Sequence, residues 1–196
     1  MWDGRYRTEA FLYGTEPNDF VAERFVDRPA GDVLCLADGE GRNGVYLAGL
    51  GHRVTSVDIS EAGIAKARAL ADERGVQLDA HVVDLGEFDL GAGLWDTIVS
   101  VFAHTPPPVR RKVHAALATA LKPGGLLILE AYTPDQIGRG TGGPQIPELT
   151  MDLERLRDEL VGLVFEHEAE FVRPVIEGPG HTGDGAVVQV VARRPA

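Results

Sequence analysis

Short apolar runs alternate along the chain with segments in which apolar residues recur at helical spacing. The first run, DVLCLA at residues 32–37, is almost continuous, which is typical of a strand buried on both faces of a parallel sheet. RVTSVDI at residues 53–59 is rich in β-branched residues and predicts a second strand. Further strands are predicted in the same way at residues 77–84, 95–102, 126–132, 163–176 and 186–192. This alternation predicts an α/β fold with a mostly parallel sheet.

Capping and breaking residues mark the helices between these strands. Ser60 is a predicted N-cap for a helix that Gly75 ends. Three prolines at residues 106–108 start another helix, because proline is tolerated in the first turn. Near the end of the chain, four glycines fall within residues 178–185. They predict the loop of an antiparallel hairpin between the last two strands.

Composition and charge narrow the classes of partner. The formal net charge is −11, and nucleic acids and acidic lipid surfaces are bound through clustered Lys and Arg. The densest basic cluster, residues 110–112, is predicted to lie on the exposed face of a helix. We therefore expect neither a nucleic acid nor a membrane as partner. No run approaches the ~20 apolar residues of a membrane span and a secretory signal is lacking, so we expect a cytoplasmic protein.

The candidate chemistry begins at the turn after the first strand, ADGEGRNG at residues 37–44. In an open parallel sheet, ligands bind beyond the carboxyl ends of the strands. Gly39 and Gly41 permit a tight turn and let a ligand approach the backbone. Asp58 ends the second strand about twenty residues later, which is the spacing expected for a carboxylate that accepts both ribose hydroxyls. The alternative is that Asp58 caps the following helix.

The same glycines satisfy the dinucleotide fingerprint, so a nicotinamide-dependent oxidoreductase is an alternative. Three features speak against it. The chain leaves little room for a separate substrate domain, and it ends in a hairpin rather than in a second mononucleotide-binding half. In addition, Asp84 ends the third strand, where it can accept a hydrogen bond from an adenine amino group.

The whole chain resembles the Rossmann-like (class I) S-adenosylmethionine-dependent methyltransferases. The matching stretches are VLCLADGEGRNGVYLA, VTSVDIS, VVDLGEFDL, WDTIVSVF and LKPGGLLILEAYT. The resemblance implies a three-layer sandwich around a seven-stranded, mostly parallel sheet with an antiparallel C-terminal hairpin. It implies S-adenosyl-L-methionine as the cofactor. Within the family, GEGRN and the small size resemble the tellurite-resistance and thiol methyltransferase branches.

The resemblance also implies a cofactor site. The backbone of residues 37–41, including Ala37 and Asp38, would face the methionine end of the cofactor, with Asn43 near its carboxylate or amino group. Asp58 would hold the ribose and Ile59 would stack against the adenine. The remaining contacts implied are the adenine boundary and the floor below the sulfonium, made by Asp84, Leu85 and Val101.

Two positions depart from the family pattern. The family usually has Asp where this chain has Cys35, and Gly where it has Ala37. Ala37 leaves less room for the methionine moiety, so the cofactor pose is expected to shift slightly. Cys35 is expected to be a packing residue, and as the only cysteine it excludes an intramolecular disulfide.

Methyl transfer from a sulfonium is an in-line displacement, so a general base is needed only when the acceptor arrives protonated. His104, which follows the fourth strand at the ligand-binding edge, is the first candidate; the alternative is a structural hydrogen bond. Tyr132 ends the fifth strand and is a candidate for contacting the substrate, or for packing alone. His181 lies in the glycine-rich loop, where it could reach over the pocket, although we favour an exposed loop histidine. The three are too scattered to predict a metal site.

These observations favour a methyltransferase that acts on a small-molecule acceptor: a thiol, chalcogen, amine or hydroxyl. A non-catalytic module that binds S-adenosylmethionine or its product is the second hypothesis. We expect a monomer or homodimer with one domain over residues 1–196. Residues 1–30, rich in aromatics, form a lid or cover, residues 31–132 the cofactor-binding core, and residues 133–196 a loop, helix and hairpin. The glycine-rich segment 138–144 is a second candidate lid.

Overall fold

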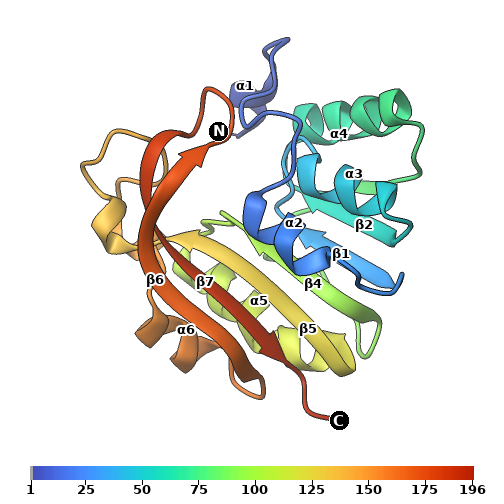
Figure 1. The fold of residues 1–196 in the computed structure, drawn as a ribbon, viewed down its shortest axis with the longest axis vertical. Helices are drawn as coiled ribbons and strands as arrows, with labels where there is room; N and C mark the ends of the chain where they lie inside the picture. The colour runs from blue at the N-terminus through green and yellow to red at the C-terminus, as the bar shows by residue number, and fades with distance from the viewer. Residues whose placement is uncertain (1) are drawn as a thin grey trace.

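Seven strands form one sheet in the computed structural model, which describes residues 2–196 (Figure 1). Their order across the sheet is β3-β2-β1-β4-β5-β7-β6. Their bounds are β1 Asp32–Leu36, β2 Arg53–Asp58, β3 Asp79–Val82, β4 Trp95–Val101, β5 Leu121–Tyr132, β6 Val164–Ile176 and β7 Thr182–Arg193. The first five strands pair in parallel, whereas β7 runs antiparallel between β5 and β6. The fold class predicted from the sequence is confirmed.

The strand order reverses between β1 and β4, because β2 and β3 continue to one side and β5 to the other. Ligands of open α/β sheets bind at such a switch point, beyond the carboxyl ends of the strands. The glycine turn follows β1 and His104 follows β4. The fold therefore brings the two regions of predicted chemistry to the same edge of the sheet.

Six α-helices connect or precede the strands in the described part of the chain, residues 2–196. They are α1 Trp2–Tyr6, α2 Asp19–Phe25, α3 Arg42–Gly49, α4 Glu61–Arg74, α5 Pro107–Ala120 and α6 Leu153–Glu159. The predicted cap of α4 is confirmed, since Ser60 Oγ accepts a hydrogen bond from Gly63 N at 3.1 Å and Gly75 ends the helix in a left-handed conformation. The sequence pattern did not predict α1 and α2. Within residues 2–196 no helix is long and apolar enough to cross a membrane.

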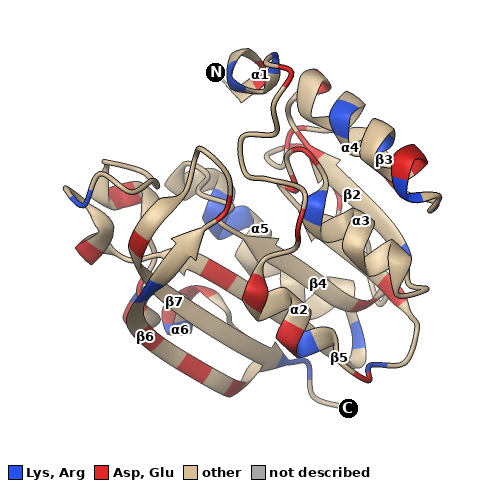
Figure 2. Ribbon diagram, turned by 45° about the horizontal axis from the view of Figure 1, so that its top comes forward, with Lys and Arg blue, Asp and Glu red and all other residues tan. Residues whose placement is uncertain are grey.

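The edge strand β6 carries acidic residues on its exposed positions (Figure 2). Glu166, Glu168 and Glu170 alternate with partly buried residues along it. An exposed edge of a sheet can pair with another chain, and charged side chains oppose such pairing. The glutamates of β6 therefore oppose pairing of this edge strand with another chain.

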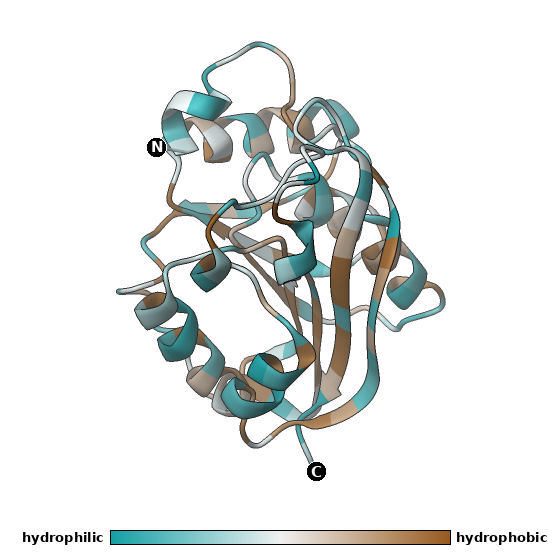
Figure 3. Ribbon diagram, turned by 90° about the vertical axis from the view of Figure 1, so that its left-hand side faces the viewer, coloured by the Kyte–Doolittle hydropathy of each residue, from teal (hydrophilic) through white to brown (hydrophobic). Residues whose placement is uncertain are grey.

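Helices cover both faces of the sheet, and alternate residues of each strand face different layers. On β1, Leu34 and Leu36 join a core cluster with α5 and α6, whereas Val33 and Cys35 join one with α2 and α3. The strands are accordingly the most hydrophobic part of the ribbon (Figure 3). Cys35 is 1% exposed, as expected of a packing residue. These layers hold the site edge rigidly.

Several boundaries differ from the sequence prediction. β3 is limited to Asp79–Val82, because the chain turns at once into the loop that contains Asp84. β7 begins at Thr182 rather than at residue 186, since residues 182–185 pair with the end of β6. The hairpin loop is therefore shorter than predicted.

The basic cluster is only partly exposed, which corrects the expectation for Arg110. This side chain is 3% exposed, and its guanidinium contacts both carboxylate oxygens of Glu159 on α6, with distances from 3.0 to 3.2 Å. His114 donates to the same carboxylate at 2.7 Å. The ion pair between α5 and α6 thus buries the Arg110 guanidinium, although the helical spacing of the sequence predicted that it is exposed.

We predict that Leu127→Ala lowers the free energy of unfolding by about 2–5 kcal/mol, because Leu127 is fully buried on central strand β5. Urea unfolding followed by circular dichroism measures the change. Leu94→Ala is the matched control, since Leu94 is 51% exposed and should lose much less. Equal losses in the two variants would contradict this account of the core.

Candidate functional site

The glycine turn between β1 and α3 is held in an unusual backbone conformation. Ala37, Gly39 and Gly41 have φ angles of 48°, 59° and 86°. A Cβ on Gly41 would lie 2.5 Å from the Cβ of Ala67 on α4, and one on Gly39 would lie 2.7 Å from the hydroxyl oxygen of Tyr6. Both glycines are therefore required for close packing as well as for conformation. Ala37 is not a glycine, yet it adopts a left-handed backbone conformation. Glycine reaches this conformation at no steric cost, whereas alanine is strained in it.

Asp58 lies beside this turn at the end of β2. Its Oδ2 accepts the Gly39 N–H at 2.9 Å, and its Oδ1 accepts the Ser60 N–H at 2.9 Å. The side chain is 6% exposed, and burial raises its pKa. A carboxylate offers about four lone-pair positions, so about two remain for other donors. Asp58 thus supports the turn and start of α4 and still fits a pair of hydroxyl groups.

Asp38 and Asn43 direct their side chains into the protein. Asp38 Oδ2 accepts hydrogen bonds from Gly44 N at 3.1 Å and from Ser56 Oγ at 2.8 Å, and burial raises its pKa to about 7. Asn43 Oδ1 accepts the Asn18 N–H at 2.9 Å. These side chains fix the turn and the N-terminal segment. The ligand contact that the resemblance implies for Asp38 is one made by its backbone, and it stays a prediction.

The adenine side of the predicted site lies where β2 and β3 end together. The backbone N–H of Val83 donates to the Asp58 carbonyl at 2.8 Å, which brings the two strand ends side by side. Ile59 is 56% exposed there, although it is a large apolar residue. Asp84 is exposed and Leu85 is 8% exposed. This arrangement offers an apolar side chain and a carboxylate at one strand edge.

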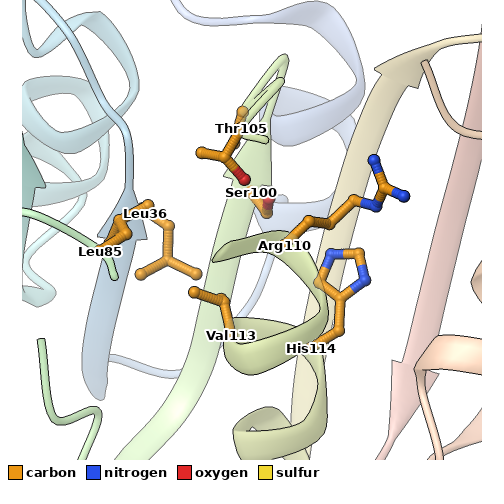
Figure 4. A pocket seen from close by; sticks show the side chains of 8 residues that line it. Leu36, Leu85, Ser100, Thr105, Arg110, Val113 and His114 are labelled. Atoms are coloured by element: carbon orange, nitrogen blue, oxygen red, sulfur yellow. The ribbon is translucent and has the colours of Figure 1, made fainter. Parts of the chain in front are cut away.

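A small hollow adjoins Leu85 on the α5 side of the sheet (Figure 4). It is lined from β1, β4 and α5 by residues that include Leu36, Ser100 and Val113. It has room for about one water molecule and is too small for a nucleoside or an acceptor. Val101, the predicted floor below the sulfonium, lies on β4 and belongs to the core cluster on the opposite face.

The N-terminal segment, residues 2–18, lies across the glycine turn. Tyr6 covers Gly39, and the Leu12 N–H donates to Glu40 Oε2 at 2.7 Å. At its far side, the Leu12 carbonyl accepts the Gly180 N–H at 2.8 Å. The segment therefore bridges the turn and the β6–β7 hairpin. This placement fits the cover predicted from the aromatic residues.

His104 is held by two backbone hydrogen bonds. Its Nδ1 lies 2.8 Å from the Leu149 carbonyl, which can only accept, so Nδ1 carries the proton. Its Nε2 accepts the Tyr132 N–H at 3.2 Å. Burial lowers the pKa of His104 to about 4. Both nitrogens are occupied, so the geometry favours the structural alternative over the general base that the sequence suggested.

Tyr132 is fully buried, which limits its direct role. Its ring stacks on Phe102 and His104 with centroid distances of 4.5 and 5.7 Å. Within residues 2–196 its hydroxyl has no hydrogen-bond partner, and burial raises its pKa. The arrangement favours packing, and a contact with substrate stays a prediction.

His181 is 4% exposed, so the expectation of an exposed loop histidine was wrong. Its ring lies against Tyr13 and Phe102, with centroid distances of 4.5 and 4.7 Å. Nδ1 lies 3.0 Å from Glu177 Oε2. The covering N-terminal segment and the end of β4 enclose this residue, and neither is near it in sequence.

Two buried carboxylates, Glu130 and Glu177, complete the site. Arg173 donates to Glu130 through two nitrogens at 2.7 and 2.8 Å, and Arg42 donates to Glu177 Oε2 at 2.7 Å. Asn18 Nδ2 donates to both carboxylates, at 2.6 and 2.9 Å. Sequence reasoning missed these residues. One signal was available, because Glu130 interrupts the apolar run LLILEAY, where a charge must be paired.

The comparisons with known proteins agree with this geometry. Residues 33–125 match the family model described as "Methyltransferase domain". Ubiquinone biosynthesis O-methyltransferase of Xanthomonas campestris pv. campestris is 35% identical over 116 residues, which cover 57% of this chain and 46% of that protein. The chain therefore spans about half the length of the curated relatives it matches.

Solved structures share the fold over nearly the whole chain. One, described as "Conversion of a Disulfide Bond into a Thioacetal Group during Echinomycin Biosynthesis", has a TM-score of 0.79 at 24% identity and covers 99% of this chain and 90% of that chain. TehB from Haemophilus influenzae has a TM-score of 0.69 at 20% identity, with coverage of 98% and 65%. At these identities the likeness concerns the fold.

These findings point to one class of protein. Residues 33–125 match the methyltransferase domain model and the curated relatives are methyltransferases, which agrees with the resemblance to the Rossmann-like S-adenosylmethionine-dependent methyltransferases. A methyltransferase activity and S-adenosyl-L-methionine as its cofactor, both expected from the sequence, agree with these matches, which cover 46% of the curated relative. The placement in the tellurite-resistance and thiol methyltransferase branches stays a prediction.

We predict that Glu177 makes the protein sensitive to acid. Burial alone would raise its pKa, but the contacts with His181 and Arg42 outweigh burial and hold the pKa at about 2, below its ordinary value of 4.5. A carboxyl group with a lowered pKa stabilises the fold at pH values above its ordinary pKa. This contribution to the free energy of unfolding, up to about 3 kcal/mol, is lost as the pH falls from about 5 to 2.

Unfolding free energies measured over that pH range test the prediction. Glu177→Gln should show a flatter dependence and lower stability at neutral pH, because Arg42 and Arg173 lose a charged partner. Glu154→Gln, at an exposed position on α6, is the control and should follow the wild type. An unchanged acid profile in the Glu177 variant would refute this role for the carboxylate.

Proposed function

We propose that this protein transfers a methyl group from S-adenosylmethionine to a small-molecule acceptor. The observation that carries the proposal is the hydrogen bond from Gly39 N to Asp58 Oδ2 at 2.9 Å. It places a buried carboxylate suited to ribose hydroxyls directly beside a glycine turn suited to the methionine moiety. Both lie at the switch point of the sheet, where ligands of this fold class bind.

The cofactor site would be made by the backbone of residues 37–41, with Asp58 at the ribose. Ile59 supports a stacking contact with adenine, because it is large, apolar and 56% exposed at this edge. Asp84 and Leu85 would bound the adenine, and Val101 would lie below the sulfonium. Asn43 anchors the N-terminal segment through Oδ1, and its Nδ2 amide would lie near the carboxylate of the methionine moiety.

When bound, S-adenosylmethionine supplies an electrophilic methyl group on a good leaving group. The residues of the chain then have to orient the acceptor and exclude water, and such positioning is worth up to about 7–11 kcal/mol in favourable intramolecular models. The segment over the glycine turn and the buried ion pairs beneath the hairpin make this edge of the sheet rigid.

We further propose a hydroxyl group as the methylated group. The names of the curated relatives, ubiquinone biosynthesis O-methyltransferases, support oxygen as the acceptor atom. A small molecule is favoured over a nucleic acid by the net charge of −11 and by the burial of Arg110. The single sheet supports one domain over residues 1–196.

Calorimetric titration tests cofactor binding. Wild type should bind S-adenosylmethionine and S-adenosylhomocysteine but not NADH. Asp58→Ala should weaken the affinity for S-adenosylmethionine by at least about tenfold, because the carboxylate that accepts hydrogen bonds from the ribose hydroxyls is lost. Asp72→Ala, at an exposed position on α4, is the matched control and should bind as wild type does.

Three results would count against this proposal. Binding of NADH alone would mean a nicotinamide enzyme, and unchanged affinity in Asp58→Ala would make Asp58 purely structural. Tight binding of S-adenosylmethionine without release of S-adenosylhomocysteine, in a screen of thiols, amines, phenols and chalcogen oxyanions, would mean a non-catalytic binding module.

A further inference from the structure

The chemistry of His181 follows from its partner, Glu177. The low pKa of Glu177 makes it a carboxylate at neutral pH, and a carboxylate only accepts hydrogen bonds. The contact of 3.0 Å therefore requires the proton on Nδ1 of His181. In the neutral ring the other nitrogen, Nε2, then carries the lone pair.

Nε2 of His181 is free to use that lone pair. It has no hydrogen-bond partner among residues 2–196. It is not one of the fully buried polar atoms, so it retains access to solvent. His104 has the opposite arrangement, because its Nε2 accepts the Tyr132 N–H at 3.2 Å. Of the two histidines near the ends of β4 and β7, only His181 offers a base.

His181 also lies at the methyl side of the proposed cofactor site. Arg42, the first residue of α3, donates to the same Glu177 oxygen that accepts from His181, at 2.7 Å. The imidazole packs against Phe102, which directly follows Val101 at the end of β4, with ring centroids 4.7 Å apart. The ring is therefore connected through Glu177 to the first residue of α3, which follows the turn, and through Phe102 to the end of β4, which carries the predicted floor below the sulfonium.

The hairpin holds this pair in register. Glu177 N donates to the His181 carbonyl at 3.0 Å, so the backbone closes the turn between the same residues whose side chains are paired. A base that is oriented by a carboxylate on its far nitrogen is the arrangement that activates hydroxyl groups in many enzymes. A thiolate acceptor would need no such base.

We infer that His181 is the catalytic base for a hydroxyl acceptor and that Glu177 is the residue that positions it; this rests on the proposed methyltransferase function. The acceptor oxygen bonds to the methyl carbon as the carbon–sulfur bond breaks, and the electron pair of that bond stays on sulfur. The hydroxyl proton passes to Nε2 of His181. Glu177 stabilises the imidazolium, which returns the proton to solvent.

The surroundings of His181 keep it neutral and ready to accept a proton. Burial lowers its pKa, the Glu177 carboxylate opposes this shift, and nearby cations add to it. The charged and titratable groups that face it come from every neighbouring element: Glu177, Arg42, Arg173, Tyr13, Tyr132 and His104. Methyl transfer to a hydroxyl should thus fall only as the pH drops below the ordinary histidine range of about 6.5.

Two acceptors distinguish a base from a structural residue. Catechol arrives protonated, whereas thiophenol is largely ionised at neutral pH. With saturating S-adenosylmethionine, His181→Gln should lower the release of S-adenosylhomocysteine with catechol by about 10²–10⁴-fold and remove the acid limb of the pH profile. Release with thiophenol should stay within about threefold of wild type, because no proton must be removed. His167→Gln, the same substitution at the far end of β6, is the control.

The inference is overturned by equal losses with both acceptors, by an unchanged rate with catechol, or by a wild type that methylates thiophenol alone.

A second measurement needs no acceptor. Nitrogen NMR of the imidazoles should show His181 neutral at pH 7 with its proton on Nδ1, and Glu177→Gln should lower its pKa. A proton on Nε2, or a cationic ring, would overturn the inference. Failure of S-adenosylmethionine to bind would instead count against the proposed function.

Discussion

Four parts of the chain meet at the Glu177 carboxylate. Arg42 reaches it from the first turn of α3, Arg173 from β6, Asn18 from the N-terminal segment and His181 from the hairpin loop. A buried charge has a large desolvation cost unless it is paired and hydrogen-bonded. This constraint ties the glycine turn, the cover above it and the hairpin to one another. The relative positions of these three segments depend on it.

The ends of β1 and β4 show a second constraint. Each strand is followed by a non-glycine residue with a positive φ, 48° at Ala37 and 51° at Phe102. These two strands flank the switch point of the sheet. The surrounding packing must sustain the backbone strain at both of these strand ends. Phe102 N donates to the Glu130 carbonyl at 2.7 Å, which links one of these turns to the buried carboxylates.

Local patterns predicted much of the fold and part of the site. The apolar runs located the strands, the caps at Ser60 and Gly75 located α4, and the glycine turn with Asp58 located the proposed cofactor region. The polar residues were harder to place. His104 and His181 are both single histidines near glycines or prolines in loops, and nothing in the neighbouring sequence distinguishes them. Their hydrogen bonding differs, because the backbone of Leu149 and Tyr132 engages both nitrogens of His104, whereas Glu177 engages only Nδ1 of His181.

The sequence by itself determined the alternation of strands and helices, the glycine turn and the carboxylate that follows it, because each depends on residues close together in the chain. Only the tertiary structure decided which charged and titratable groups meet. Arg42 and Glu177 are separated by 135 positions, and Asn18 and Glu130 by 112. Such pairs form because burial forces each polar group to find a partner, and the partner is chosen by the packing of the sheet rather than by sequence spacing.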